Sequence, residues 1–313
     1  MVSNHNAAIN TTYIEWTRLL SFLDISNQSV PEAVHWAKLY SRIDIDGPSA
    51  SLQQSLDNLT NWSIDWQLSI IVQKCCVLSL NNNKLVCQNN NSSYYLNGVL
   101  LTSSEQVLDL GITISFDLSF KNHINNIVSK AFQRSSTLFR GFTSRHLHLM
   151  RNAFITYIRP LLEYNSIILN PVHVYLIDLL ESVQRRFSKR ILAISALPYA
   201  TRLNLLDLQP LELRRLHFDL VNYYKILNGL SPLNPQHYFI VQNSIPSTRS
   251  VAPHLLKPLR ASNKFCSSFF YRNTEARNFL SSASKSATSV TAFKRALKNI
   301  DLSGFLKDTS CRS

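Results

Sequence analysis

The sequence predicts an α+β protein in which a small antiparallel β-rich segment precedes a mainly α-helical bundle and a helical tail. Residues 31–118 contain short apolar or β-branched runs separated by turn-forming residues, which favours strands. Residues 119–230 carry apolar side chains at helical spacing, which favours amphipathic helices. Residues 231–313 are first interrupted by prolines and then return to helical spacing, as expected for a C-terminal extension. Residues 1–30 form a divergent N-terminal segment.

Charge is distributed unevenly along the 313 residues, whose formal net charge is +13. Residues 1–100 hold five Lys/Arg and seven Asp/Glu residues, whereas the remainder holds 27 and 12, a net charge of +15. A basic excess confined to the helical part favours a polyanionic partner, nucleic acid before membrane. The alternative is a basic surface that only keeps the protein soluble.

The cysteines and the N-terminus bear on the cellular compartment. Five cysteines without the spacing of a zinc knuckle or redox pair argue against a secreted disulfide framework. Polar residues follow Met1 where a signal peptide would be basic and then apolar. No apolar run is long enough to span a bilayer. We therefore expect an intracellular protein, in the nucleus or cytoplasm, without membrane association.

The β-rich part is expected to contain one helix and several short strands. Ser51 is expected to cap this helix, in which leucines and then tryptophans recur at helical spacing. A strand is predicted at 74–80, and a hairpin around the turn Asn97-Gly98. Residues 108–114 are predicted to form one more strand, in which an interior glycine indicates close approach of another backbone.

Four helices are predicted in the bundle, over residues 121–140, 145–164 and 176–194 and from Pro210 to Asn228-Gly229. Pro160 should kink or bound the second helix, whose apolar face is expected to include Tyr157. Cationic side chains lie off the apolar stripes, and we take them as candidate nucleic-acid contacts. They are Lys130, Arg134, Arg140, Arg151, Arg159, Arg185, Arg186, Lys189, Arg190, Arg214 and Arg215.

The third helix has the clearest cationic cluster. Arg185–Lys189 and Arg186–Arg190 are like-charge pairs four residues apart, an arrangement that slightly disfavours an isolated helix. A polyanion facing this cluster would offset the repulsion through phosphate contacts and counterion release. The alternative is a face that is only solvated.

The segment that follows the bundle offers fewer chemical groups. Pro198-Tyr199 is expected to start a linker between the third and fourth helices. An aromatic run at Phe265, Phe269, Phe270 and Tyr271 suits stacking on bases, although packing into the helical part is the more common use and the one we favour. Ser289 is expected to cap a last helix.

Six short motifs occur in a fixed order along the chain, and a resemblance to a known family depends on them. They are Lys38-Leu39-Tyr40-Ser41, Leu52-Gln53-x-x-Leu56, Trp62-Ser63-x-x-Trp66-Gln67-Leu68, Lys74-Cys75-x-Val77-Leu78, Tyr95-Leu96-Asn97-Gly98 and Leu108-Asp109-Leu110-Gly111-Ile112. In this order they resemble the reverse transcriptases of non-LTR (LINE-type) retrotransposons, from the end of the palm onward. The resemblance covers roughly residues 37–305 and implies a palm remnant at 31–118, a thumb-like domain at 119–230 and a C-terminal extension.

The resemblance implies RNA-directed DNA polymerase chemistry, which needs two metal ions, Mg²⁺ in active relatives, held by carboxylates. The family's Asp-Asp box should lie just before the Lys38-Leu39-Tyr40-Ser41 motif, where this chain has Ala33-Val34-His35-Trp36. Asp44 and Asp46 precede Gly47-Pro48 and are best interpreted as part of a solvated loop. We therefore predict no catalytic residue, no metal ligand and no cofactor, and the palm segments before the box are not recognisable.

Lys74 is a motif remnant. It matches the lysine of the family's fourth palm motif, which is proposed there as a general acid for the leaving pyrophosphate. Without metal carboxylates there is no leaving group to protonate, so we interpret Lys74 as a charged residue at the start of a strand.

These features together predict a truncated, catalytically inactive reverse transcriptase that keeps a basic helical surface for RNA or DNA, independent of sequence. One alternative is a non-enzymatic helical module that binds other proteins, in which the basic stripe is incidental. Another is the non-functional product of a decayed element. The sequence leaves the oligomeric state open.

Overall fold

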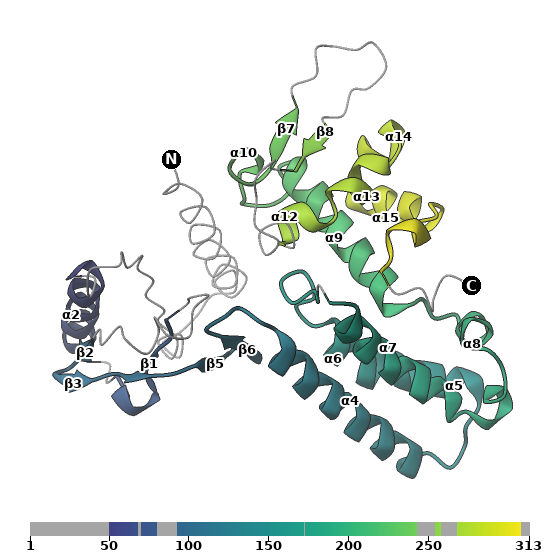
Figure 1. The fold of residues 1–313 in the computed structure, drawn as a ribbon, viewed down its shortest axis with the longest axis horizontal. Helices are drawn as coiled ribbons and strands as arrows, with labels where there is room; N and C mark the ends of the chain where they lie inside the picture. The colour runs from purple at the N-terminus through teal and green to yellow at the C-terminus, as the bar shows by residue number, and fades with distance from the viewer. Residues whose placement is uncertain are drawn as a thin grey trace. The chain divides into compact units, whose positions relative to one another are not determined.

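The computed structural model describes residues 50–67, 70–79, 93–171, 173–242, 254–257 and 268–307. The chain divides into two compact units, Met1–Phe120 and Lys121–Ser313, which are treated separately below (Figure 1). The N-terminal segment, Ala33 to Trp36 and the Asp44/Asp46 pair lie outside the described residues. The architecture is mixed α and β with several two-stranded sheets, as the sequence predicts at the level of fold class.

The first unit is built on a helix and a hairpin. Helix α2 (Ala50–Asp65) begins where the leucine periodicity predicts. Strands β2 (Tyr95–Leu96) and β3 (Val99–Leu100) form the predicted hairpin, and Asn97 and Gly98 both have positive φ, as a type I′ turn requires. The Gln53 side chain of α2 donates to the Tyr95 carbonyl at 2.9 Å and accepts from its N–H at 3.0 Å. These bonds hold the helix against the hairpin.

The strand predicted at 108–114 is wrong, because this segment belongs to a second hairpin. Strand β5 (Gln106–Asp109) pairs antiparallel with β6 (Ile112–Ser115). Leu110 and Gly111 form the turn with φ of 45° and 81°, so the chain reverses where a continuous strand was expected. Gly111 therefore provides a left-handed turn conformation instead of space for another backbone.

One of the two-stranded sheets described in the first unit differs from the all-antiparallel prediction. Strand β1 (Cys76–Val77) pairs parallel with β4 (Thr102–Ser103). The predicted strand at 74–80 is shorter than expected because Val72–Lys74 form a 3₁₀ turn immediately before it. Parallel pairing here is possible because a long connection separates the two strands in sequence.

The second unit contains the predicted helices. Helices α4 (Lys121–Gly141) and α9 (Leu211–Leu227) match two of the expected segments. Helix α7 (Val174–Lys189) matches most of the third, but it ends before the predicted residue 194, and Leu192–Ile194 form a separate 3₁₀ turn. Pro210 stands at the N-cap of α9, and Gly229 ends the helix with φ of 67°. The predicted linker at Pro198-Tyr199 is instead the start of α8 (Tyr199–Leu205).

The second predicted helix is interrupted as its proline suggests. Helix α5 (Leu147–Ala153) continues through a π-helical turn, Phe154–Ile158, into α6 (Arg159–Glu163). Pro160 has no N–H to donate to the preceding turn, and wider π-helical bonding accommodates the loss. The extra residue in that turn rotates the face of the helix, so Tyr157 is 52% exposed and not inward as predicted.

The C-terminal part of the second unit consists of short elements. They are α10 (Pro235–Tyr238), the antiparallel pair β7 (Ile240–Gln242) and β8 (His254–Leu256), α12 (Phe269–Arg272), α13 (Thr274–Phe279), α14 (Ser282–Lys285) and α15 (Val290–Lys298). The Oγ of Ser289 accepts from the Ala292 N–H at 3.1 Å, which confirms the predicted cap. Phe269, Phe270 and Tyr271 are buried, which confirms packing for this part of the aromatic run.

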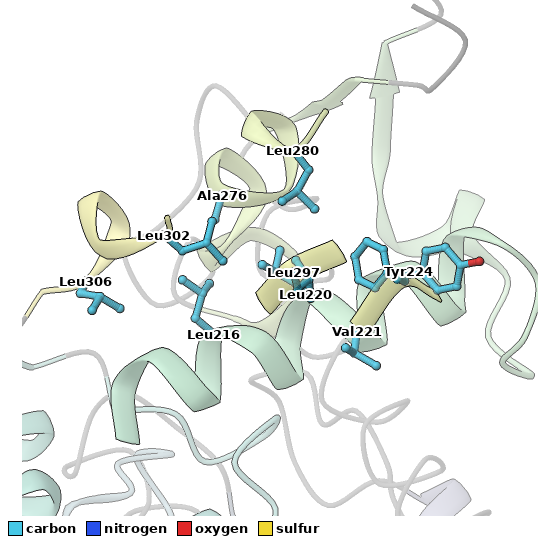
Figure 2. Close-up of a cluster of buried hydrophobic side chains, with 10 residues drawn as sticks. Leu216, Leu220, Val221, Tyr224, Ala276, Leu280, Leu297, Leu302 and Leu306 are labelled. Atoms are coloured by element: carbon cyan, nitrogen blue, oxygen red, sulfur yellow. The ribbon is translucent and has the colours of Figure 1, made fainter. Parts of the chain in front are cut away.

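A shared apolar core joins α9 to these C-terminal helices. Figure 2 shows leucines of α9, including Leu216 and Leu220, facing Ala276 of α13 and Leu297 of α15. The rings of Tyr224 and Phe293 stack at 4.4 Å between centroids. The extension is therefore anchored on α9 by burial of apolar surface.

A buried ion pair reinforces this attachment. The Arg272 guanidinium donates to both carboxylate oxygens of Asp219, at 2.6 and 2.7 Å, and also to the Ile167 carbonyl at 2.6 Å. Asp219 is 1% exposed, and Asn273 donates to the same carboxylate. These contacts thus join α9, α12 and the segment after α6.

No helix within the described ranges is long and apolar enough to cross a membrane.

Candidate nucleic-acid interface

Helices α4 and α7 lie side by side in the second unit (Figure 1). Ala131 of α4 and Val183 of α7 belong to the buried stripes that bring the helices together. The rings of Phe139 and Phe187 lie 5.0 Å apart between centroids at the C-terminal end of this contact. Because apolar residues occupy the contact, the cationic residues of both helices remain on the flanks.

The C-terminal halves of α4 and α7 enclose a surface hollow of about 320 Å³, here called the basic hollow. Cation–π contacts position two of its guanidinium groups. The Arg186 guanidinium lies 5.3 Å from the Phe132 ring centroid, and that of Arg190 lies 4.1 Å from the Phe139 centroid. The lining residues are Phe132, Gln133, Ser135, Ser136, Thr137, Arg140, Arg186 and Arg190.

The cations around the basic hollow are not neutralised by carboxylates. In the part of the chain that the structure describes, Lys130, Arg140, Arg186, Lys189 and Arg190 make no ion pair within 4.0 Å. The pKa of Arg190 is lowered, chiefly by burial and then by repulsion from Arg145 and Arg186. An anion in the hollow would relieve this repulsion.

Several other predicted contacts are engaged within the protein. Arg134 donates to the Tyr157 carbonyl at 3.1 Å, and Arg185 pairs with Asp178 at 2.9 Å. Arg151 pairs with Asp207 at 2.5 Å and donates to the Leu206 carbonyl at 2.7 Å. These arginines fix helices and loops of the bundle, so only part of their donor capacity faces solvent.

Glu163 at the end of α6 collects two further predicted contacts. Arg159 lies 3.8 Å from its carboxylate, and Arg214 binds it through both Nε and Nη2. The pKa of Arg159 is lowered by burial first and by Arg214 second, with Glu163 acting in the opposite direction. This cluster ties α9 to α6 and leaves one net positive charge at the surface.

Arg215 lies inside the protein and not on the predicted surface. It is 4% exposed, and its guanidinium donates to the backbone carbonyls of Leu162 and Leu169. Burial, followed by repulsion from Arg272, lowers its pKa to about 10. Its position on α9 places its guanidinium against the last turn of α6 and the segment that follows, and it donates to one carbonyl of each. We exclude it from the candidate interface.

Sequence periodicity overlooked the residues that support the basic hollow. Phe132 and Phe139 are not among the predicted contacts, yet their rings lie against Arg186 and Arg190. Arg145, outside the predicted set of contacts, lies 5.4 Å from the Phe139 ring centroid and donates to the Phe139 carbonyl at 3.5 Å. The available signal was the recurrence of Phe seven residues apart on one helix.

Lys74 is exposed and ends the 3₁₀ turn that precedes β1 in the first unit. It therefore lies close to a strand start, as interpreted from the sequence.

Among the residues described, no group of three His, Cys, Asp or Glu side chains is arranged to hold a metal ion.

Two histidines make the stability of the second unit depend on pH. Burial lowers the pKa of His123 and His217 below the ordinary 6.5, and nearby Lys130 and Arg214, respectively, add to the effect. The unfolded chain therefore binds more protons as the pH falls through 6.5, so the free energy of unfolding should fall by up to about 1.4 kcal/mol per pH unit per histidine. Urea unfolding at pH 7.5 and 5.5 measures this loss.

The double substitution His123→Gln and His217→Gln should reduce that pH dependence. Replacing the exposed Asn126 of α4 by glutamine removes no titratable group, so this control should leave the pH dependence unchanged. An identical pH dependence in the double variant and the wild type would contradict the assignment.

Comparisons with known proteins add a partial relative. The chain is 30% identical over 127 residues to an uncharacterized protein of Caenorhabditis elegans. This match covers 40% of the chain and spans 64% of the length of that relative. No family model and no solved structure matches the chain. The relative carries no assigned activity, so the match indicates no function for this chain.

Proposed function

We propose that this chain is related to the reverse transcriptases of non-LTR retrotransposons and lacks polymerase activity. It binds RNA or DNA independently of sequence through the α4–α7 face, the surface that carries Lys130, Arg140, Arg186, Lys189 and Arg190. The motifs along residues 38–112 support the relationship. The observation that carries the binding proposal is the basic hollow with its flanking cations, which have no carboxylate partner in the described structure. Sequence independence follows because Lys and Arg contacts to phosphate carry no base information.

The residue types at the expected metal box support the loss of polymerase activity. Ala, Val and Trp side chains cannot ligate Mg²⁺, and a neutral imidazole suits softer metal ions than Mg²⁺. We expect no nucleotide incorporation in a primer-extension assay with Mg²⁺ or Mn²⁺. Incorporation above a no-protein control would overturn this part of the proposal.

Binding should weaken steeply as salt rises. If about four of the five unpaired cations contact phosphates, raising the salt from 50 to 200 mM should lower the affinity for duplex DNA about 100-fold, since each contact contributes about −0.9 to the logarithmic slope. Fluorescence anisotropy with labelled 20-mers across this range gives the slope. Scrambled sequences of equal composition should bind equally.

A flat affinity across that salt range would count against phosphate contacts. A strong preference among scrambled sequences would contradict sequence-independent binding and favour readout of base edges. Neither outcome depends on whether the protein polymerises.

A further inference from the structure

The basic hollow differs in shape and charge from the flank of the α4–α7 face. Lys130 and Lys189 of this face are exposed and lie outside the hollow. In the hollow, Arg140, Arg186 and Arg190 line one concave space of about 320 Å³. Three arginines that line one volume favour a compact ligand with several negative oxygens.

Neighbouring rings help to hold the arginines in place. Arg186 and Arg190 lie against Phe132 and Phe139, at 5.3 and 4.1 Å from the ring centroids. A guanidinium on an aromatic face can keep its N–H groups directed outward in the plane. The ring contact thus limits side-chain freedom without neutralising the charge, which prepares the groups for an anion.

The number of charges selects the class of anion. A phosphodiester of a nucleic-acid backbone carries about one negative charge, whereas a phosphomonoester carries about −1.5 to −2 at pH 7 and presents three acceptor oxygens. No carboxylate in the described chain competes for Arg140, Arg186 or Arg190 within 4.0 Å. Three unneutralised guanidinium groups match the monoester better than the diester.

We infer that the basic hollow is a binding site for a phosphomonoester group, such as the terminal phosphate of a nucleic-acid strand or a free mononucleotide. This inference rests on the proposed function and narrows it: the cations of the face bind backbone phosphates, and the arginines of the hollow bind a terminal phosphate in preference where one is present. The ligand lies between the C-terminal halves of α4 and α7 and is contacted by Arg140, Arg186 and Arg190.

The test compares oligothymidylates of ten nucleotides that differ only at their ends. Strands with a 5′-phosphate, a 3′-phosphate or only hydroxyl ends are titrated into the full chain at 100 mM salt, with anisotropy as the readout. We expect one phosphorylated strand to bind about tenfold more tightly than the hydroxyl-ended strand, as charge-assisted Arg–phosphate bonds of this kind allow. Thymidine monophosphate as competitor then distinguishes a strand end from a free nucleotide as the source.

Arg190→Gln and Arg140→Gln should each reduce the end preference toward one. Lys294→Gln on α15 is the control with the same change of charge, and it should keep the preference. Arg140 is exposed, so its variant tests the site even where loss of the Arg190–Phe139 contact disturbs folding, which circular dichroism would show.

Equal binding of the three strands by the wild type would overturn the inference. A preference that persists in both arginine variants would also overturn it, since the phosphate would then bind elsewhere. In either case the salt-dependent binding of the hydroxyl-ended strand still tests the proposed function separately.

Discussion

Reversing Arg186, Lys189 and Arg190 to glutamate is expected to lower the affinity for RNA and DNA about 100-fold or more at low salt. The reversal replaces two cations in the last turn of α7 and the arginine at its C-cap by three anions, and none of the three cations has a carboxylate partner in the described structure. Each lost phosphate contact should also reduce the logarithmic salt slope by about 0.9 on duplex DNA, so the slope should fall by between two and three, roughly. Anisotropy titrations at several salt concentrations measure both quantities.

The matched control is the triple reversal of Lys294, Arg295 and Lys298 on α15. These residues are exposed, lie on one helix and change the net charge by the same amount. They should weaken binding far less, because they lie outside the α4–α7 face. Equal losses in the two triple variants would show that net charge alone governs binding. Binding unaffected by the α7 reversal would favour the alternative, a helical module that binds other proteins.

Arg185 is not part of this reversal. Although periodicity places it in the same cluster, its guanidinium pairs with Asp178 at 2.9 Å and lies over the Tyr199 ring. Reversing it would set two carboxylates against each other and mix a folding defect with a binding defect. The reversal is therefore limited to three cations whose loss breaks no ion pair in the described structure.

Replacing Asp219 by alanine should lower the free energy of unfolding by about 3–5 kcal/mol, because it removes one partner of a buried ion pair. Arg272 would keep a buried charge without its bidentate carboxylate, and Arg215 lies nearby with a lowered pKa. Burial raises the pKa of Asp219 while Arg272 opposes this shift, so the ionised form depends on that arginine. Urea unfolding followed by circular dichroism measures the loss.

Asp207→Asn is the control for this prediction, because asparagine removes the charge and tolerates the left-handed φ of 47° at this position. Asp207 also pairs with an arginine, Arg151, but its side chain is 88% exposed. Exposed pairs contribute about 0–1 kcal/mol, so this variant should change stability little. Similar losses at Asp207 and Asp219 would contradict the role given to burial. The double variant Asp219→Leu and Arg272→Met should recover part of the stability, since apolar residues can replace a buried pair.

Local patterns predicted the long helices and one hairpin well. Apolar spacing located α4, α7 and α9, and the Asn97-Gly98 turn located β2 and β3. These elements depend on residues close in sequence, whose periodicity and turn chemistry are visible without a structure. Residues 108–114 were assigned as one strand because their apolar run hid a turn at Leu110–Gly111.

The candidate interface was predictable only in part. Helical spacing placed Arg140, Arg186 and Arg190 off the apolar stripes. It did not show that α4 and α7 would bring them around one hollow, nor that Phe132 and Phe139 would support them. Both facts depend on which helices pack together, and contacts between distant segments leave no local periodicity.

Local sequence patterns are sufficient to predict an α+β protein whose helices have cationic flanks. Which of these cations remain available to a partner depends on how the helices pack. Arg215 and Arg186 look alike in a helical pattern, yet one is buried against backbone carbonyls and the other lines a hollow. The reason is physical, since a buried guanidinium must satisfy its donors inside the protein, and only packing shows which acceptors it meets.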